Sequence, residues 1–298
     1  MSERSHAHAS RRLLIVGGSA ALLAACGKRE KAVGPAPGTP PAKTLRTVDD
    51  AIAGRWRSAA DKSRDRWRHP RESLVFWGLR PGMTVVEFWP GAGWYTDILG
   101  PYLTATGGVL YAANMEPGPR GAPTELMVDG YRAKMAARRD LYGAVKPSTF
   151  GAASGPVAPA NSADLALFLR NLHNWMAAGT AEKAFREAFA ALKPGGVLGV
   201  EEHRARPGGI QDGLAASGYV QEAYVRRLAQ EAGFRFAAAS EINANPKDDR
   251  DHPFGVWTLP PTRLTAPRGQ PANPRFNRAS YDAIGESDRM TLKFVKPK

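Results

Sequence analysis

The chain has 298 residues, enough for one domain with a sizeable core, and 43% of them are hydrophobic. Its single cysteine, Cys26, excludes a disulfide within the chain and a metal site built from several thiolates. The formal charge of +13 makes nucleic acid the first partner to consider.

Residues 1–25 are predicted to be an export signal rather than part of the fold. Arg11 and Arg12 precede an apolar run that is shorter than the roughly 20 residues needed to span a bilayer. Leu23-Ala24-Ala25-Cys26 resembles the bacterial lipoprotein signal, in which the cysteine becomes the lipid-modified first residue. The double arginine also resembles a twin-arginine signal, with an ordinary positive n-region as the alternative.

This signal predicts that the protein lies on the periplasmic side of the cell envelope, anchored to a membrane by lipid on Cys26. Its removal takes away three arginines and one glutamate, which lowers the formal charge from +13 to +11. For a protein in that place, anionic lipid headgroups or envelope polymers are more plausible partners than nucleic acid. We therefore expect no nucleic-acid partner.

Residues 26–43 are rich in proline and glycine and predict an extended tether, followed by one folded domain over 44–298. Helices are expected from Thr47 through Ala60, from Pro70 to Leu79, after Thr96, and at about 131–142, 179–192 and 219–232. Strands are expected at 84–89, 109–113, 165–169, 197–201, 234–242 and 289–295.

This alternation predicts an α/β fold, a Rossmann-like doubly wound sheet that is mostly parallel and closes with an antiparallel C-terminal strand. The stretch 243–282 carries many prolines, asparagines and charges, and it is expected to be a loop insertion. A loop of that length in a compact domain is usually functional or flexible.

The stretch Thr84–Thr96 is the strongest local signal, because an apolar run ends in Glu87 and then turns through Gly91 and Gly93 into a helix start. Such a turn offers backbone N–H groups to an anionic or polar cofactor. A dinucleotide-type fingerprint would carry a third glycine, but Trp89 occupies that position. A purely structural strand-to-helix turn is the alternative.

Polar side chains also follow the other predicted strands, at the edge where ligands bind in doubly wound sheets. These groups are Asn114 with Glu116, Asn171 to Trp175, Glu201 to Arg204, and Asn243 to Pro246. Four different strands are therefore expected to bring carboxylates, amides and imidazoles to one edge of the sheet.

The chain resembles the class I S-adenosylmethionine-dependent methyltransferases, and in particular a predicted extracytoplasmic family of proteobacteria with a Pro-Gly-x-Gly-Trp-Tyr-Thr turn. The matching segments are Arg68–Pro70, Glu87–Thr96, Arg170–Trp175, Leu192–Gly196, Glu202–Ala205, Glu241–Pro246, Gly255–Pro261 and Ser287–Pro297. The resemblance covers nearly the whole domain, from about residue 46 to the end.

The resemblance implies that S-adenosyl-L-methionine is the cofactor. Gly91 and Gly93 would let the backbone approach its amino-acid part, and Glu87 would face its ammonium group. The full set of implied cofactor-binding residues is Glu87, Pro90, Gly91, Gly93, Tyr95, Asn114 and Asn171. Asn114 stands where an acid normally accepts both ribose hydroxyls, and an amide has only one acceptor oxygen unless Glu116 substitutes for it.

His173 and His203 are the expected catalytic bases, because an imidazole titrates near neutral pH, and Glu202 could orient one of them. A structural role for each histidine is the alternative. Metal binding by these groups with His252 is disfavoured, since no short ligand spacing is present.

Two charged segments are expected to be solvated. They are the loop Asp248–His252, and the arginines between 55 and 71, for which phosphate contact is the less favoured alternative. The tryptophans and Tyr95 near the strand ends are expected to belong mainly to the core.

We therefore expect an enzyme that transfers a methyl group to an oxygen or nitrogen of a small or envelope-associated acceptor. A catalytically inactive methyltransferase fold that serves as an envelope binding protein is the alternative. A metal-dependent hydrolase is a weaker third hypothesis.

Overall fold

The computed structural model describes residues 45–298, and Thr44–Lys298 form one compact unit. The predicted export signal, Cys26 and the tether lie outside the described residues. No helix within 45–298 is long and apolar enough to cross a lipid bilayer.

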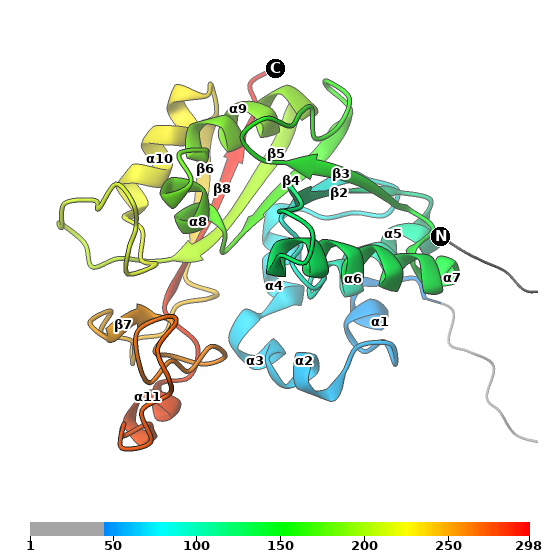
Figure 1. Ribbon diagram of the computed structural model, residues 1–298. Helices are drawn as coiled ribbons and strands as arrows, with labels where there is room; N and C mark the ends of the chain where they lie inside the picture. The colour runs from blue at the N-terminus through cyan, green and yellow to red at the C-terminus, as the bar shows by residue number, and fades with distance from the viewer. Residues whose placement is uncertain (1–44) are drawn as a thin grey trace, which may run out of the picture. The chain divides into compact units, whose positions relative to one another are not determined.

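The centre of the domain is a seven-stranded sheet with the order β3-β2-β1-β4-β5-β8-β6 (Figure 1). The strands are β1 (Thr84–Phe88), β2 (Val109–Met115), β3 (Val145–Phe150), β4 (Ala163–Leu169), β5 (Leu192–His203), β6 (Arg235–Ser240) and β8 (Arg289–Val295). Strands β3, β2, β1, β4 and β5 pair in parallel, and β8 runs antiparallel to both β5 and β6. The predicted Rossmann-like sheet with an antiparallel C-terminal strand is confirmed.

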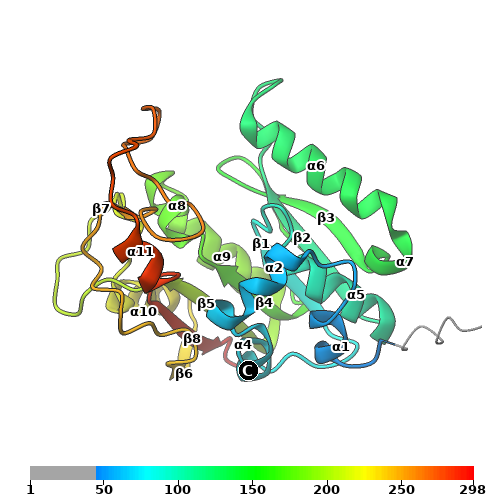
Figure 2. The ribbon, with the colours of Figure 1, turned by 90° about the horizontal axis from the view of Figure 1, so that it is seen from below.

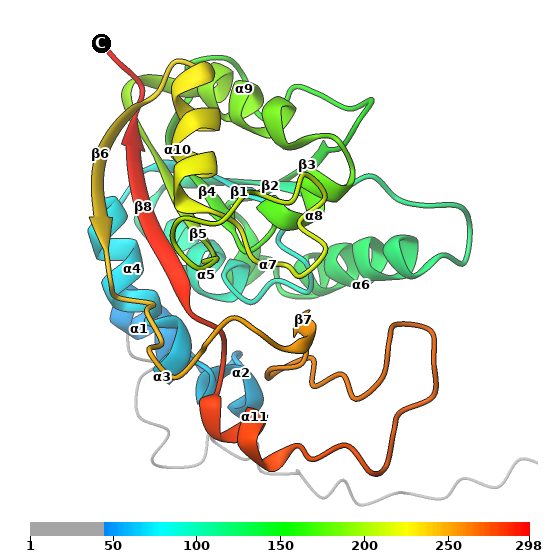
Figure 3. The ribbon, with the colours of Figure 1, turned by 90° about the vertical axis from the view of Figure 1, so that its left-hand side faces the viewer.

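Helices cover both faces of the sheet because its central strands bury side chains on both sides (Figures 1 and 3). Val85 and Leu167 pack with α1 (Val48–Ile52), α4 (Pro70–Trp77) and α5 (Thr96–Thr106). Val86 and Phe168 pack with α8 (Leu172–Ala177), α9 (Ala181–Ala191) and α10 (Glu222–Glu231). The alternation follows the two-residue period of a strand. Helices α6 (Pro123–Ala137) and α7 (Arg139–Tyr142) follow β2.

The helix expected from Thr47 through Ala60 is wrong in its extent. It begins as predicted, with a capping box between Thr47 and Asp50, but α1 ends at Ile52. Gly54 follows, and a side chain there would collide with the Trp56 ring. The chain then forms two short helices, α2 (Ala59–Ser63) and α3 (Asp65–Arg68). These lie near the carboxyl ends of the parallel strands, the edge that Figure 2 views.

The insertion contains more regular structure than a loop. It includes the short strand β7 (Pro253–Val256) and leads into α11 (Ala279–Ile284). Both lie beyond the start of β8, at the same edge of the domain as α2 and α3 (Figures 1 and 2). Strand β3 was not expected because it contains Pro147, which is tolerated at the sheet edge that β3 occupies.

Candidate functional site

The turn after β1 has the backbone shape that glycine favours at three positions. Gly91 and Gly93 have φ values of 59° and 90°, and Trp89 has 47°. A left-handed conformation costs a non-glycine residue about 1–2 kcal/mol. The Trp89 indole offsets this cost, because its Nε1 donates to the Phe150 carbonyl at 2.8 Å and its ring packs edge-on against Trp175. Trp89 thus has the left-handed backbone conformation that a glycine would adopt at this position.

A pocket of about 320 Å³ lies against this turn, within the size range of small-molecule sites. Its wall combines the glycine turn, the α2 and α3 helices, the end of β4 and one residue of α6. The residues that line it are Asp61, Arg64, Arg68, Trp89, Pro90, Gly91, Ala92, Trp94, Asp97, Lys134, Leu169, Arg170 and Asn171. Of the predicted cofactor-binding residues, Pro90, Gly91 and Asn171 therefore line one pocket.

Asn171 joins β4 to the turn. Its Nδ2 donates to the carbonyls of Phe88 and Trp89, at 3.3 and 3.0 Å. Gly91 has open space where a Cβ would lie, so a ligand can approach its backbone closely. At Gly93 a Cβ would lie 3.3 Å from the Tyr131 ring, which favours glycine for packing reasons as well.

Glu87 and Tyr95 are buried beneath the pocket rather than in its wall. The Glu87 carboxylate accepts a hydrogen bond of 2.6 Å from the Thr96 hydroxyl. Burial raises the pKa of Glu87 to about 7, against the opposing effect of that hydrogen bond. The Tyr95 hydroxyl donates to Glu201 at 3.3 Å, and burial raises the pKa of Tyr95.

The position expected to bind ribose carries an amide that is buried. Asn114 donates from Nδ2 to the Ala112 carbonyl at 3.2 Å and does not line the pocket. Glu116 is engaged elsewhere, because its carboxylate accepts from the backbone N–H groups of Ala153 and Ser154 at 3.0 and 2.7 Å. Glu116 thus secures the loop after β3.

The three predicted catalytic residues lie together. His173 Nδ1 is 3.0 Å from Glu202 Oε1, and the centres of the His173 and His203 rings are 5.2 Å apart. The Glu202 carboxylate is fully buried and also accepts from the backbone N–H groups of Leu172, His173 and His203. His203 Nδ1 lies 2.6 Å from the Ser287 hydroxyl. Burial lowers the pKa of His203 well below 6.5, and His173 and nearby arginines add to this effect.

Within residues 45–298, two groups of side chains have ligand atoms close enough to consider a metal ion: His173 with Glu202 and His203, and Asp248 with Asp249 and His252. In both, hydrogen bonds already occupy the central carboxylate. Asp248 accepts from the Tyr219 hydroxyl and from the backbone N–H groups of Arg250 and Asp288, and it lies 2.8 Å from His252 Nε2. The expectation of a solvated loop is wrong for Asp248, which is buried and secures the insertion.

The expectation of a solvated arginine face is also wrong in part. Arg57 and Arg68 are only 3% and 7% exposed. Arg57 forms a two-pronged pair with Asp65, whereas Arg64, Arg68 and Arg170 line the pocket. The sequence analysis placed Arg64 and Arg68 on a solvated face, with phosphate contact as the less favoured alternative, and gave Arg170 no role. The available signal was that Arg68 and Arg170 each begin a segment that matches the methyltransferase resemblance.

The solved structures similar to this chain include S-adenosylmethionine-dependent methyltransferases. One from Aquifex aeolicus is 22% identical, with a TM-score of 0.46 over 61% of this chain and 87% of that chain. An arsenic(III) S-adenosylmethionine methyltransferase from Chlamydomonas reinhardtii is 15% identical, with a TM-score of 0.47 over 88% and 75% of the chains.

A possible exported protein from Bordetella parapertussis is 20% identical, with a TM-score of 0.44 over 79% of this chain and 68% of that chain. No protein-family model and no curated protein matches the chain. These likenesses concern the fold alone.

The residues fit the amino-acid half of S-adenosylmethionine better than its ribose. At the turn, Gly91 has a positive φ and leaves open space over its backbone, which is the cradle that such a ligand needs. At the position where the resemblance implies a ribose contact, Asn114 has a single acceptor oxygen where a carboxylate has two, and it does not line the pocket. The glycine turn is therefore the main anchor to test.

Proposed function

We propose that this protein is an S-adenosylmethionine-dependent methyltransferase whose cofactor binds against the turn from Trp89 to Gly93. The observation that carries this proposal is the pocket at that turn, where Gly91 leaves its backbone open and Asn171 fixes the turn to β4. The site lies at the carboxyl edge of the sheet, where ligands of doubly wound folds bind.

When bound, S-adenosylmethionine supplies an electrophilic methyl group on its sulfonium, and transfer to an oxygen or nitrogen leaves S-adenosylhomocysteine. The protein must align the acceptor and accept the proton that the acceptor loses. Glu202 beside Nδ1 of His173 favours a proton on that nitrogen, which leaves Nε2 as the basic atom. We assign His173 as the base, Glu202 as its positioning residue, and neutral His203 as its neighbour.

A binding protein that has kept the fold without catalysis is the second candidate. Buried Asn114 at the ribose position favours it, since a weaker hold on the cofactor is expected there. The two candidates differ in turnover: the enzyme releases S-adenosylhomocysteine in the presence of an acceptor, and the binding protein does not.

Calorimetric titration of the purified chain with S-adenosylhomocysteine tests the proposal. We expect saturable binding, and we expect Gly91→Leu to abolish it because the leucine side chain enters the pocket. Gly107→Leu is the matched control: Gly107 also has a positive φ, of 75°, and open space around it, but it lies at the far end of α5. No binding of millimolar S-adenosylhomocysteine by the unaltered chain would show that the proposal is wrong.

We also propose that the protein acts on the periplasmic side of a membrane, held by lipid on Cys26. The support is the sequence Leu23-Ala24-Ala25-Cys26 at the end of an apolar run. Cys26→Ser should move the protein from the membrane fraction to the soluble fraction of cells. Unchanged membrane attachment of the variant would contradict the anchor.

A further inference from the structure

Four arginines and two glutamates form a network at the pocket, in which Arg64, Arg68 and Arg170 belong to the wall and Arg289 and the glutamates are buried. Glu286 receives Arg64 Nε at 2.6 Å, Arg68 Nε at 3.2 Å and Arg289 Nη1 at 2.8 Å. Glu201 lies 2.9 Å from Arg170 Nη1 and 3.2 Å from Arg289 Nε. Four guanidinium groups therefore share two carboxylates, and both carboxylates are buried.

The aspartates in the pocket wall do not supply the missing negative charge directly. Asp97 pairs with Lys134 at 2.6 Å. The Asp61 carboxylate accepts from the Ser58 hydroxyl at 2.6 Å, at the start of α2. Within residues 45–298, Nη2 of Arg64 is buried without a hydrogen-bond partner. Arg64 lines the pocket, and an oxyanion bound there would supply an acceptor for a guanidinium that has an unpaired donor.

The same arginines are held in place before any ligand arrives. The guanidinium of Arg68 lies 4.6 Å from the centre of the Trp94 ring, and that of Arg170 lies 5.8 Å from the Tyr95 ring. Arg170 adopts a left-handed backbone, with φ of 61°, and its N–H donates to the Glu201 carbonyl at 2.7 Å. The pKa of Arg68 is lowered to about 9, first by burial and then by the charge of Arg170. These guanidiniums are therefore rigid and short of negative charge.

The network reaches the histidines as well as the glycine turn. Arg289 is the cross-strand partner of His203 in the pairing of β5 with β8. Arg170 begins the segment that continues through Asn171 to His173, and Glu201 directly precedes Glu202. The network thus includes residues of the pocket wall and a cross-strand neighbour of His203, and a methyl acceptor has to reach both the cofactor and the base.

We propose that Arg64, Arg68 and Arg170 bind an oxyanion, a carboxylate or a phosphate, carried by the methyl acceptor. This inference rests on the proposed methyltransferase function for the identity of the bound molecule, and on the arginine network for its charge. Guanidinium groups match both oxyanions because they donate paired N–H groups in one plane. The expected substrates are therefore acidic small molecules or acidic groups of envelope components.

Calorimetric titration with inorganic phosphate at constant ionic strength tests the charge of the ligand. We expect saturable binding that weakens at least about tenfold in Arg68→Gln, which removes one charge-assisted contact. Arg64→Gln is the second variant, since its partly exposed side chain makes misfolding less of a concern. Lys193→Gln is the control, because Lys193 is a cation in a different pocket. Absence of phosphate binding by the unaltered chain overturns the oxyanion site. Equal phosphate affinity in the unaltered chain and its three variants overturns it as well.

A second titration, of phosphate into protein saturated with S-adenosylhomocysteine, identifies the source of the oxyanion. Unchanged phosphate affinity supports the acceptor, because both ligands then fit together. Competition between the two would assign the arginines to the cofactor's own carboxylate and overturn our proposal. If phosphate binds and S-adenosylhomocysteine does not, the methyltransferase function fails while the oxyanion site stands.

Discussion

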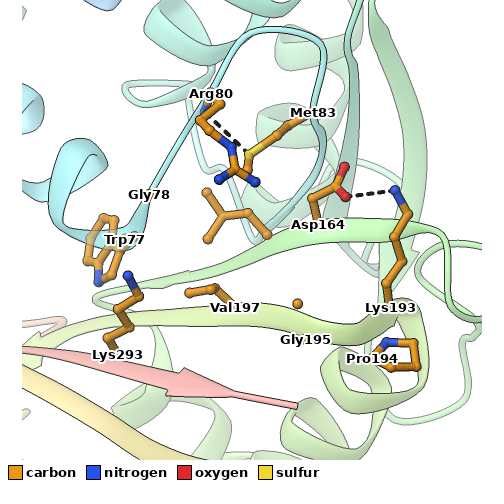
Figure 4. A pocket seen from close by; sticks show the side chains of 12 residues that line it. Trp77, Gly78, Arg80, Met83, Asp164, Lys193, Pro194, Gly195, Val197 and Lys293 are labelled. Atoms are coloured by element: carbon orange, nitrogen blue, oxygen red, sulfur yellow. Dashed lines mark hydrogen bonds and ion pairs between the residues drawn. The ribbon is translucent and has the colours of Figure 1, made fainter. Parts of the chain in front are cut away.

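Two basic pockets lie at opposite edges of the sheet. The one at the carboxyl edge has a volume of about 320 Å³, and the one at the amino edge has about 250 Å³. Figure 4 shows the latter, in which Lys193 extends toward Asp164 at 2.7 Å and the backbone N–H of Arg80 donates to the Met83 sulfur at 3.3 Å. Lys293 donates to the Phe76 carbonyl at 3.1 Å. By size and charge the two pockets are similar.

They differ in how their cations are held. Arg80 is exposed and the Lys193 side chain is 47% exposed, so water can solvate both charges. The arginines at the carboxyl edge share too few carboxylates and are fixed by aromatic rings. Positive charge in a pocket favours an anionic ligand when the charge is buried and incompletely paired. A solvated lysine with its own aspartate gives no such indication.

The largest effect is expected where the network is cut. Arg289→Met takes a donor from three acceptors at once, the carboxylates of Glu201 and Glu286 and the Trp67 carbonyl, so the free energy of unfolding should fall by about 3–5 kcal/mol. Chemical denaturation followed by circular dichroism measures this change. Arg80→Met at the amino edge serves as the control and should stay within about 0.5 kcal/mol of the unaltered chain. Equal losses in the two variants would erase the difference between the pockets.

The effect next in size depends on pH. Burial raises the pKa of Glu87 from 4.5 to about 7, so the protonated form contributes stability that is complete below pH 4.5. This contribution is lost as the pH rises through 7, because the folded pKa lies above the unfolded one. Glu87→Gln cannot ionise, so the unaltered chain should lose about 3 kcal/mol more than the variant between pH 4.5 and 8. Denaturation at several pH values gives the free energy of unfolding of both proteins. The same change of that free energy with pH in both proteins would refute this prediction.

The smallest effect is expected at the amino edge. Lys193→Met breaks the ion pair with Asp164, and both side chains are partly exposed. Such pairs contribute about 0–1 kcal/mol, so the melting temperature should change little. A loss as large as that of Arg289→Met would mean that the amino-edge pocket is also built on a buried charge.

Local patterns in the sequence were enough to predict the glycine turn and every strand of the sheet except β3. Strand β8 runs from Arg289 to Val295 as expected, because its alternating residues pair between β5 and β6. Glu202 lies at the end of β5, and His173 follows the end of β4. Because β4 and β5 are parallel neighbours, the two side chains could be placed together. These features depend on residues whose spacing along the chain determines their position in space.

The arginine network could not be predicted in the same way. Arg68 is buried and Arg64 is partly buried, and both contact Glu286, which is more than 200 residues later in the chain. Except for Trp67, the residues between them are charged, so the segment has the pattern of a solvated helix. Trp89 shows the same limit: its left-handed backbone depends on contacts with Phe150 and Trp175. Burial that depends on distant partners leaves no local pattern.

The most direct test of the central claim is a crystal structure of the chain grown with S-adenosylhomocysteine and phosphate. We predict S-adenosylhomocysteine against the backbone of Gly91 and a phosphate within hydrogen-bond distance of Arg68 and Arg170. The amino-edge pocket beside Lys193 should contain neither. Either ligand bound at the amino edge, with the glycine turn free of both, would contradict the account.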